Sequence, residues 1–225
     1  MHRTRIRIAE DALDANTTIA NANWVDFERA GVQVVNLMSA PGSGKTTLLE
    51  RVLPALPLRA GVLEGDVQGA IDAGRLAALH IPVVQVNTDP GFGGECHLDA
   101  NMVRSALPEL DLGAIDLLMI ENVGNLVCPA EFRVGEDARA MICSVTEGED
   151  KPLKYPLMFR ACELVVINKV DLLPHLEFDL ERLQYNVDAV NPEATQIVLS
   201  ARSGEGVEAF GEWLTAIPER AAAAA

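Results

Sequence analysis

The sequence is poor in basic residues and has no long apolar run. Its 225 residues include 18 lysines and arginines against 33 aspartates and glutamates, which gives a formal net charge of -15. A non-specific surface for nucleic acid or for an anionic membrane normally needs a basic patch, so both partners are disfavoured. No apolar stretch reaches the length of a signal peptide or a membrane span. We therefore expect a cytoplasmic protein that binds neither nucleic acid nor membrane.

Cysteine is also scarce, with four residues at Cys96, Cys128, Cys143 and Cys162. In a cytosolic chain of this size they do not predict a disulfide framework, because that compartment keeps thiols reduced. Metal binding and simple burial in the core remain as explanations for these cysteines. Cys143 lies in an apolar run and Cys162 just before another, so we expect both in the core.

What the sequence does contain is a series of short apolar runs separated by segments of helix length. The predicted strands are residues 32–38, 60–63, 83–86, 115–120, 164–167 and 197–199. Most are apolar at nearly every position, as in strands that are buried on both faces. The pattern predicts an α/β fold with a doubly wound, mostly parallel sheet flanked by helices, whose functional loops follow the strands. A helix is expected over residues 6–27, before the first strand.

A phosphate-binding loop is predicted after the first strand, where residues 39–46 read S-A-P-G-S-G-K-T and a helix pattern follows. Ser39 stands where the usual pattern has glycine. Lys45 is expected to neutralise the β- and γ-phosphate oxygens, and the Thr46 hydroxyl to ligate Mg²⁺. Backbone amides at the start of the helix complete the phosphate site. The predicted phosphate-binding residues are Gly42, Ser43, Gly44, Lys45, Thr46 and Thr47.

A guanine-binding motif is predicted much further along the chain, where Asn168, Lys169 and Asp171 form N-K-V-D directly after an apolar run. The Asp171 carboxylate can accept from both guanine N1–H and the exocyclic amine, whereas adenine would leave it unpaired. Ser200 and Ala201 follow the last predicted strand and supply a backbone amide for the guanine O6 atom. Alone, N-K-x-D can be an ordinary exit from a strand, but here it follows a phosphate loop in the expected order.

Two acidic residues lie between these motifs, Asp66 and Glu121, each at the end of a predicted strand. Glu121 occupies the place of the aspartate in the D-x-x-G motif of many GTPases, so we expect it to sense Mg²⁺ and Gly124 to sense the γ-phosphate. Asp66 is a second candidate for Mg²⁺ or for the attacking water, with Asp72 as a competitor; solvated loop acids are the alternative. No basic residue is an obvious arginine finger, so slow intrinsic GTP hydrolysis is expected.

Cys96 and His97 are adjacent in the sequence, and Cys128 lies seven residues after Glu121. Two thiolates and an imidazole suit Zn²⁺ or Ni²⁺. Because adjacent side chains on an extended backbone diverge, we expect Cys96 and His97 to need a second subunit to complete one site. The alternative is that the cysteines are small buried residues and His97 is a surface group.

These residues together resemble the HypB family, the nickel-inserting GTPases of [NiFe]-hydrogenase maturation. The resemblance rests on residues 36–49, 64–66, 96–98, 121–129 and 144–156. It implies a P-loop NTPase of the SIMIBI class that forms a GTP-dependent homodimer, with Cys96, His97 and Cys128 of both subunits holding Ni²⁺ or Zn²⁺. It also implies that Lys154, or its competitor Lys151, reaches the nucleotide of the opposite subunit. The implied partners are a HypA-type zinc and nickel protein and the hydrogenase large-subunit precursor.

Some members of the family have an N-terminal Cys-x-x-Cys-Gly-Cys site or a histidine-rich tract, and neither motif occurs in this sequence. The expected activity is hydrolysis of GTP to GDP coupled to nickel delivery. The alternatives are a urease-accessory-type nickel GTPase, whose motif is Cys-Pro-His, and a metal carrier whose nucleotide is structural. Our domain interpretation is a helical extension at residues 1–30, a GTPase domain at 31–220 and a tail at 221–225.

Overall fold

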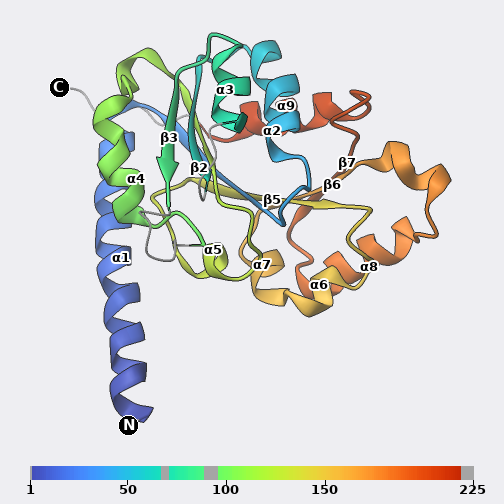
Figure 1. The fold of residues 1–225 in the computed structure, drawn as a ribbon, viewed down its shortest axis with the longest axis horizontal. Coiled ribbons are helices and arrows are strands. Elements are labelled where there is room, and N and C mark those ends of the chain that lie inside the picture. The colour runs from blue at the N-terminus through green and yellow to red at the C-terminus, as the bar shows by residue number, and fades with distance from the viewer. Residues whose placement is uncertain (1, 67–70, 89–95, 219–225) are drawn as a thin grey trace.

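The computed structural model describes residues 2–66, 71–88 and 96–218, with side chains from residue 13 onward. Its centre is a seven-stranded sheet in the order β3-β2-β4-β1-β5-β6-β7 (Figure 1). Every strand pair is parallel. The strands are β1 Gln33–Ser39, β2 Ala60–Asp66, β3 Val83–Asn87, β4 Leu117–Glu121, β5 Ala138–Ser144, β6 Leu164–Asn168 and β7 Thr195–Val198. The predicted doubly wound parallel sheet is confirmed.

Helices cover both faces of the sheet. They are α1 His2–Ala30, α2 Lys45–Val52, α3 Ile71–Ala77, α4 Ala100–Ala106, α5 Cys128–Glu131, α6 Lys151–Lys154, α7 Pro156–Arg160, α8 Leu180–Val190 and α9 Val207–Ala216, with short 3₁₀ turns at Leu53–Ala55, Leu107–Glu109, Leu112–Ala114 and Val170–His175. One face packs on α2, α3 and α9. The other packs on α1 and α4 at one end and on α7 and α8 at the other. Because successive side chains of a strand point to opposite faces, each inner strand needs apolar residues at nearly every position.

All six predicted strands are present, and β5 is an additional strand where the sequence pattern predicts only an apolar core run around Cys143. β5 is buried along its whole length and pairs with β1 and β6 in the middle of the sheet. A short apolar run buried on both faces has no periodicity that separates a strand from a core helix. Only the three-dimensional structure identifies this run as a strand.

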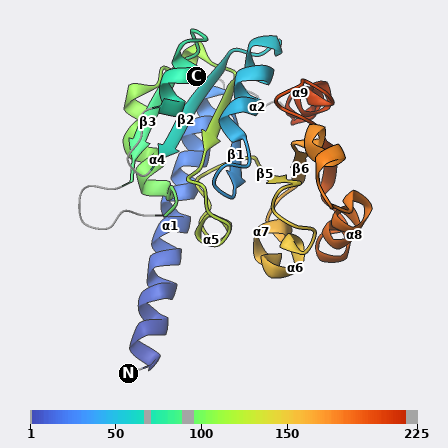
Figure 2. The same cartoon turned by 45° about the vertical axis from the view of Figure 1, so that its right-hand side comes forward.

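Helix α1 includes the helix predicted for residues 6–27. Its C-terminal part lies beside α4, while its N-terminal part extends well beyond the body of the protein (Figures 1 and 2). Within the described ranges, no helix has the length and apolar character that crossing a membrane requires. Residues 221–225, predicted as a tail, lie outside the described residues.

Candidate functional site

The loop after β1 has the backbone that a phosphate site needs. Gly42 has a φ of 73° and Gly44 a φ of 102°, both in the left-handed region that favours glycine. A Cβ atom on Gly44 would lie 2.6 Å from Nδ2 of Asn168. A side chain at Gly44 would therefore collide with Asn168, so glycine is required where the loop enters α2. Backbone amides at such a helix start can bind phosphate.

Lys45 lies at the start of α2, where its Nζ donates a hydrogen bond to Ser39 Oγ at 2.9 Å. Ser39 is the last residue of β1 and is fully buried, so the serine in place of the usual glycine is accommodated. Burial lowers the pKa of Lys45, and nearby carboxylates, led by Glu121, act in the opposite direction. The buried ammonium group of Lys45 is therefore positioned to bind an anionic ligand.

Glu121, the last residue of β4, contacts the same loop. Its Oε1 accepts a hydrogen bond from Thr46 Oγ1 at 2.8 Å. The carboxylate is 3% exposed, and its Oε2 has no hydrogen-bond partner among the described residues. Burial raises the pKa of Glu121, which Lys45 and the Thr46 bond partly offset. A buried carboxylate with one unfilled oxygen beside a threonine hydroxyl suits Mg²⁺, which prefers hard oxygen ligands.

Glu64 is a residue of this site that the sequence analysis missed. It pairs in register with Glu121 on the neighbouring strand, so both side chains point to the face that α2 covers. Glu64 is 3% exposed and its Oε2 likewise finds no hydrogen-bond partner within the described chain. Burial, and then the Glu121 charge, raise the pKa of Glu64 to about 8. The sequence signal that could have identified Glu64 is strand alternation. Ala60, Val62 and Glu64 share one face of β2, and Ala60 and Val62 face the core.

Asp66 and Asp72 both lie within electrostatic reach of Lys45. Asp66 ends β2, and Asp72 lies in the first turn of α3. Asp72 accepts a hydrogen bond from Arg75 Nη1 at 3.0 Å. The two carboxylates therefore remain competing candidates for the same role.

Arg75 is a second residue that the sequence analysis missed. Its Nη2 donates to Thr47 Oγ1 at 3.1 Å and to Glu50 Oε2 at 2.5 Å, both on α2. Packing of α3 against α2 brings this guanidinium to the first turn of the phosphate-binding helix. No sequence spacing could have identified it, because the contact depends on how the two helices pack.

The predicted guanine-binding residues contact one another and the phosphate loop. Asn168 donates from Nδ2 to the Ser43 carbonyl at 2.8 Å and accepts at Oδ1 from the Ala201 amide at 2.9 Å. Lys169 Nζ donates to the Gly42 carbonyl at 2.6 Å. A cavity of about 300 Å³ opens between these elements, and its lining includes Gly44, Thr47, Asn168, Lys169, Asp171 and Ala201. The motifs predicted separately thus border one cavity.

The predicted base-reading loop after β7 is held in place by hydrogen bonds to Asp171 and to α2. Ser200 Oγ donates to Asp171 Oδ1 at 2.6 Å, which leaves the second oxygen of that carboxylate for another donor. Arg51, on α2, donates to the carbonyls of Ala201 and Arg202 at 3.2 and 2.7 Å. The phosphate-binding helix and this loop are therefore directly connected.

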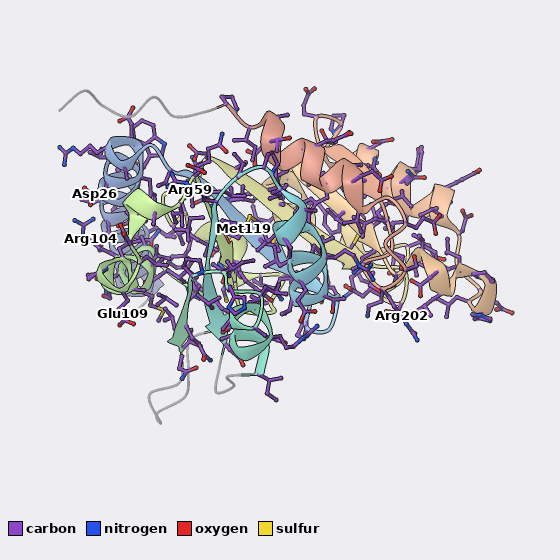
Figure 3. The ribbon with its side chains drawn as sticks, turned by 90° about the horizontal axis from the view of Figure 1, so that it is seen from above. Asp26, Arg59, Arg104, Glu109, Met119 and Arg202 are labelled. Atoms are coloured by element: carbon purple, nitrogen blue, oxygen red, sulfur yellow. The ribbon has the colours of Figure 1, made fainter. Side chains whose placement is uncertain are left out.

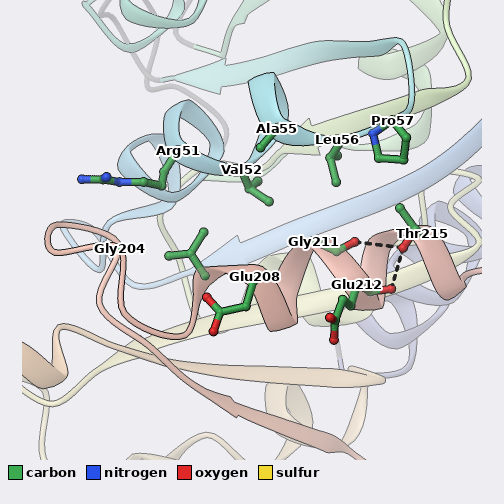
Figure 4. A pocket seen from close by; sticks show the side chains of 11 residues that line it. Arg51, Val52, Ala55, Leu56, Pro57, Gly204, Glu208, Gly211, Glu212 and Thr215 are labelled. Carbon is green, nitrogen blue, oxygen red and sulfur yellow. Dashed lines mark hydrogen bonds between the residues drawn. The ribbon is translucent and has the colours of Figure 1, made fainter.

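A separate cavity of about 520 Å³ lies between α2 and α9 (Figure 4). Arg51 and Gly204 border one end of it and Thr215 the other, and Thr215 Oγ1 donates to carbonyls of its own helix. None of the predicted site residues lines this cavity. The nucleotide candidate remains the smaller cavity at the end of the sheet.

The cysteine and histidine cluster comes together within one chain. The sulfur atoms of Cys96 and Cys128 lie 2.8 Å apart, and Cys96 Sγ lies 4.0 Å from His97 Nδ1. Ligand atoms of all three residues lie within 4.8 Å of one another. The expectation that Cys96 and His97 diverge was wrong, because the loop before α4 does not run extended there; it turns both side chains toward the start of α5.

Each ligand candidate has a different environment. Cys96 is exposed, Cys128 is half-buried, and His97 is buried with its ring centroid 4.3 Å from that of Phe132. The thiol hydrogen bond with Cys96 raises the pKa of Cys128. Two sulfur atoms and an imidazole nitrogen are a donor set suited to Zn²⁺ or Ni²⁺.

The two other cysteines are core residues, as predicted. Cys143 is 1% exposed and Cys162 is 3% exposed, and burial raises the pKa of both thiols. A thiol that stays protonated is a poor nucleophile and metal ligand. They provide controls for substitutions of Cys96 and Cys128.

The segment after β4 connects the phosphate loop with the cysteine cluster. Asn122 Oδ1 accepts from the Leu98 amide at 2.9 Å, and Asn125 Nδ2 donates to the Cys96 carbonyl at 3.1 Å. Gly124 lies against the phosphate loop, since a Cβ on it would be 2.9 Å from Pro41 Cα. The segment that begins at Glu121 is therefore hydrogen-bonded to the backbone around Cys96 and His97.

Lys154 and Lys151 both lie on α6. Lys154 is 62% exposed and pairs with Asp150 at 2.5 Å. Lys151 is more buried and lies 3.7 Å from Glu147. The greater exposure of Lys154 favours it for a contact with another subunit, and that contact stays a prediction.

Comparison with known proteins gives one consistent result. The nucleotide-binding domain described as CobW/HypB/UreG matches residues 33–198. Hydrogenase maturation factor HypB of Azotobacter vinelandii is 52% identical over 211 residues, which is 93% of this chain and 67% of that relative. The crystal structure of HypB from Helicobacter pylori in complex with nickel superposes with a TM-score of 0.84 at 35% identity, covering 89% of this chain and 94% of that one.

The crystal structure of the hydrogenase maturation factor HypB from Archaeoglobus fulgidus has a TM-score of 0.82 at 37% identity, over 91% of this chain and 98% of that one. These similarities agree with the P-loop NTPase fold. They extend over nearly the whole chain in sequence and in structure. This chain belongs to the HypB family of hydrogenase maturation factors.

Proposed function

We propose that the protein is a GTP-hydrolysing nickel metallochaperone that helps to insert nickel into a [NiFe]-hydrogenase large-subunit precursor. One observation carries the proposal: the segment from Glu121 to Cys128 touches the phosphate loop at one end and the cysteine cluster at the other. The nickel complex of the H. pylori relative supports nickel as the cargo.

The nucleotide is proposed to be GTP, because Asp171 presents a carboxylate oxygen in the cavity beside the phosphate loop. Thr46 and Glu121, with Asp66, would hold Mg²⁺, which neutralises charge on the phosphates when bound. Glu121 fits that role because its second oxygen is buried and unfilled. Lys45 and the amides of α2 bind the phosphates, and Gly124 senses the last of them.

A homodimer is proposed because three donors leave the metal site incomplete. Tetrahedral Zn²⁺ and square-planar Ni²⁺ both take four ligands. Val127, next to Cys128, and Leu157 are exposed apolar residues at 55% and 51%, and they would be covered by a second subunit. Lys154 would then reach the partner's nucleotide. A HypA-type protein and the hydrogenase precursor are the proposed partners of this cytoplasmic dimer.

Replacing Cys128 by serine is expected to abolish high-affinity nickel binding, lowering the affinity at least about 100-fold, because a thiolate ligand is lost. Isothermal titration of the purified full chain with NiCl₂ measures this. Cys143→Ala removes a buried thiol outside the cluster and should leave nickel affinity unchanged. Equal nickel affinity of wild type and Cys128→Ser would refute the proposed metal site.

A further inference from the structure

Two buried asparagines of α1 contact both chain segments that carry the metal-ligand candidates. Asn16 is 8% exposed and Asn23 is fully buried. They are seven residues apart, which is two helical turns, so their side chains lie on the same face of α1. Burying a side-chain amide is unfavourable unless its hydrogen bonds are made, so their partners determine what the two residues do.

The first segment is the start of α4, which follows Cys96 and His97. Its residue Ala100 donates its amide to Asn16 Oδ1 at 2.9 Å, and its carbonyl accepts from Asn23 Nδ2 at 2.8 Å. The two asparagines therefore bind both the backbone amide and the backbone carbonyl of Ala100, which lies three positions after His97.

The second segment follows Cys128 and α5. Asn16 Nδ2 donates to the Arg133 carbonyl at 2.8 Å, and Asn23 Nδ2 donates to the Val134 carbonyl at 3.0 Å. A Cβ on Gly135 would lie 2.8 Å from the Cβ of Asn23, so the backbone there is pressed against α1. The same two side chains thus hold consecutive residues on the far side of the cluster.

A charged contact supports this arrangement. Arg104, on α4, donates to Asn23 Oδ1 and to Asp26 Oδ2, each at 3.1 Å. Figure 3 shows Arg104 and Asp26 near each other between α4 and α1. With this bond, both amide hydrogens and the oxygen of Asn23 are engaged, so its orientation is fixed.

We propose that Asn16 and Asn23 are positioning residues for the metal site. By tying the segment after His97 to the segment after Cys128, they hold Cys96, His97 and Cys128 close together before a metal ion arrives. The inference rests on the proposed metal-binding function. Its physical basis is preorganisation: a ligand set held by surrounding hydrogen bonds loses less freedom when it binds.

A structural role alone would make the substitutions lower stability without a selective effect on the metal. Asn191 provides the matched control, because its Nδ2 also donates to two carbonyls, those of Phe159 and Cys162, each at 2.9 Å. These contacts join α7 to the end of α8 and do not involve the two segments that Asn16 and Asn23 hold. Loss of this amide should lower the melting temperature in the same way.

The test is nickel binding by the full-length variants Asn16→Ala, Asn23→Ala and Asn191→Ala, measured by competition of NiCl₂ with a chelator and by thiolate-to-nickel charge-transfer absorption. Asn16→Ala and Asn23→Ala are expected to bind Ni²⁺ about tenfold more weakly than wild type. Their GTP affinity should be unchanged. Asn191→Ala should bind Ni²⁺ as wild type does.

Wild-type nickel affinity in folded Asn16→Ala would overturn the inference, as would an equal loss in Asn191→Ala. Asn16→Ala decides the matter if Asn23→Ala does not fold, because Asn16 makes fewer contacts. Equal Ni²⁺ affinity of wild type and Cys128→Ser would instead refute the proposed metal site itself, and this inference with it.

Discussion

Asp171→Asn is expected to lose guanine selectivity and to prefer a xanthine nucleotide. The carboxylate of Asp171 is proposed to accept from guanine N1–H and from the exocyclic amine. An asparagine amide group would oppose that amine with a second donor, but it could donate to the oxygen that xanthine carries there. Because an unmatched polar pair in a buried site is costly, GTP affinity should fall about 100-fold or more.

The structure supports a direct role for this carboxylate. Ser200 Oγ occupies only Oδ1 of Asp171, at 2.6 Å, and the side chain borders the cavity beside the phosphate loop. Competition of GTP and XTP for a labelled nucleotide measures the preference. Asp188→Asn, on the exposed side of α8, is a control that should keep GTP selectivity. Unchanged preference for GTP in Asp171→Asn would contradict the assignment of the base site.

Glu121→Gln is expected to slow GTP hydrolysis about 100-fold, since the substitution keeps a hydrogen-bond acceptor for Thr46 but removes the negative charge that would face Mg²⁺. Single-turnover hydrolysis measures the loss. Glu131→Gln, at an exposed position on α5, serves as the control. Hydrolysis at the wild-type rate in Glu121→Gln would remove Glu121 from the proposed mechanism.

The same substitution should raise the free energy of unfolding of the nucleotide-free protein. Burial raises the pKa of Glu121 above the ordinary value of 4.5, so the ionised side chain destabilises the folded state. That penalty is absent below pH 4.5 and grows as the pH rises through the folded pKa. The stability advantage of Glu121→Gln should therefore increase with pH, which urea unfolding at several pH values measures. Such gains are common where a residue is kept for function.

The sequence predicted the parts of the site that lie in continuous segments. A phosphate loop after a strand and the motif around Asn168 can be located from the strands alone, because parallel strands end at one edge of the sheet. The structure then shows how they meet, through the bond from Asn168 to the Ser43 carbonyl. Local motifs and sheet direction were sufficient for this part.

The missed residues depend on packing between distant segments. Glu64 joins the site through its register with Glu121, and Arg75 through the docking of α3 on α2. The convergence of Cys96 and His97 depends on a loop conformation that spacing does not specify. The role proposed for Asn16 depends on its partners Arg133 and Ala100 on two other segments, which no pattern within the helix indicates.

The central claim is that nucleotide state and metal binding are coupled through the segment from Glu121 to Cys128. The most direct measurement is the nickel affinity of the full chain with GDP and with a non-hydrolysable GTP analogue, each in the presence of Mg²⁺. Coupling through a bistable element typically changes affinity by about 5- to 150-fold, so the two dissociation constants should differ by about tenfold. Identical nickel affinity in the two nucleotide states would contradict the account.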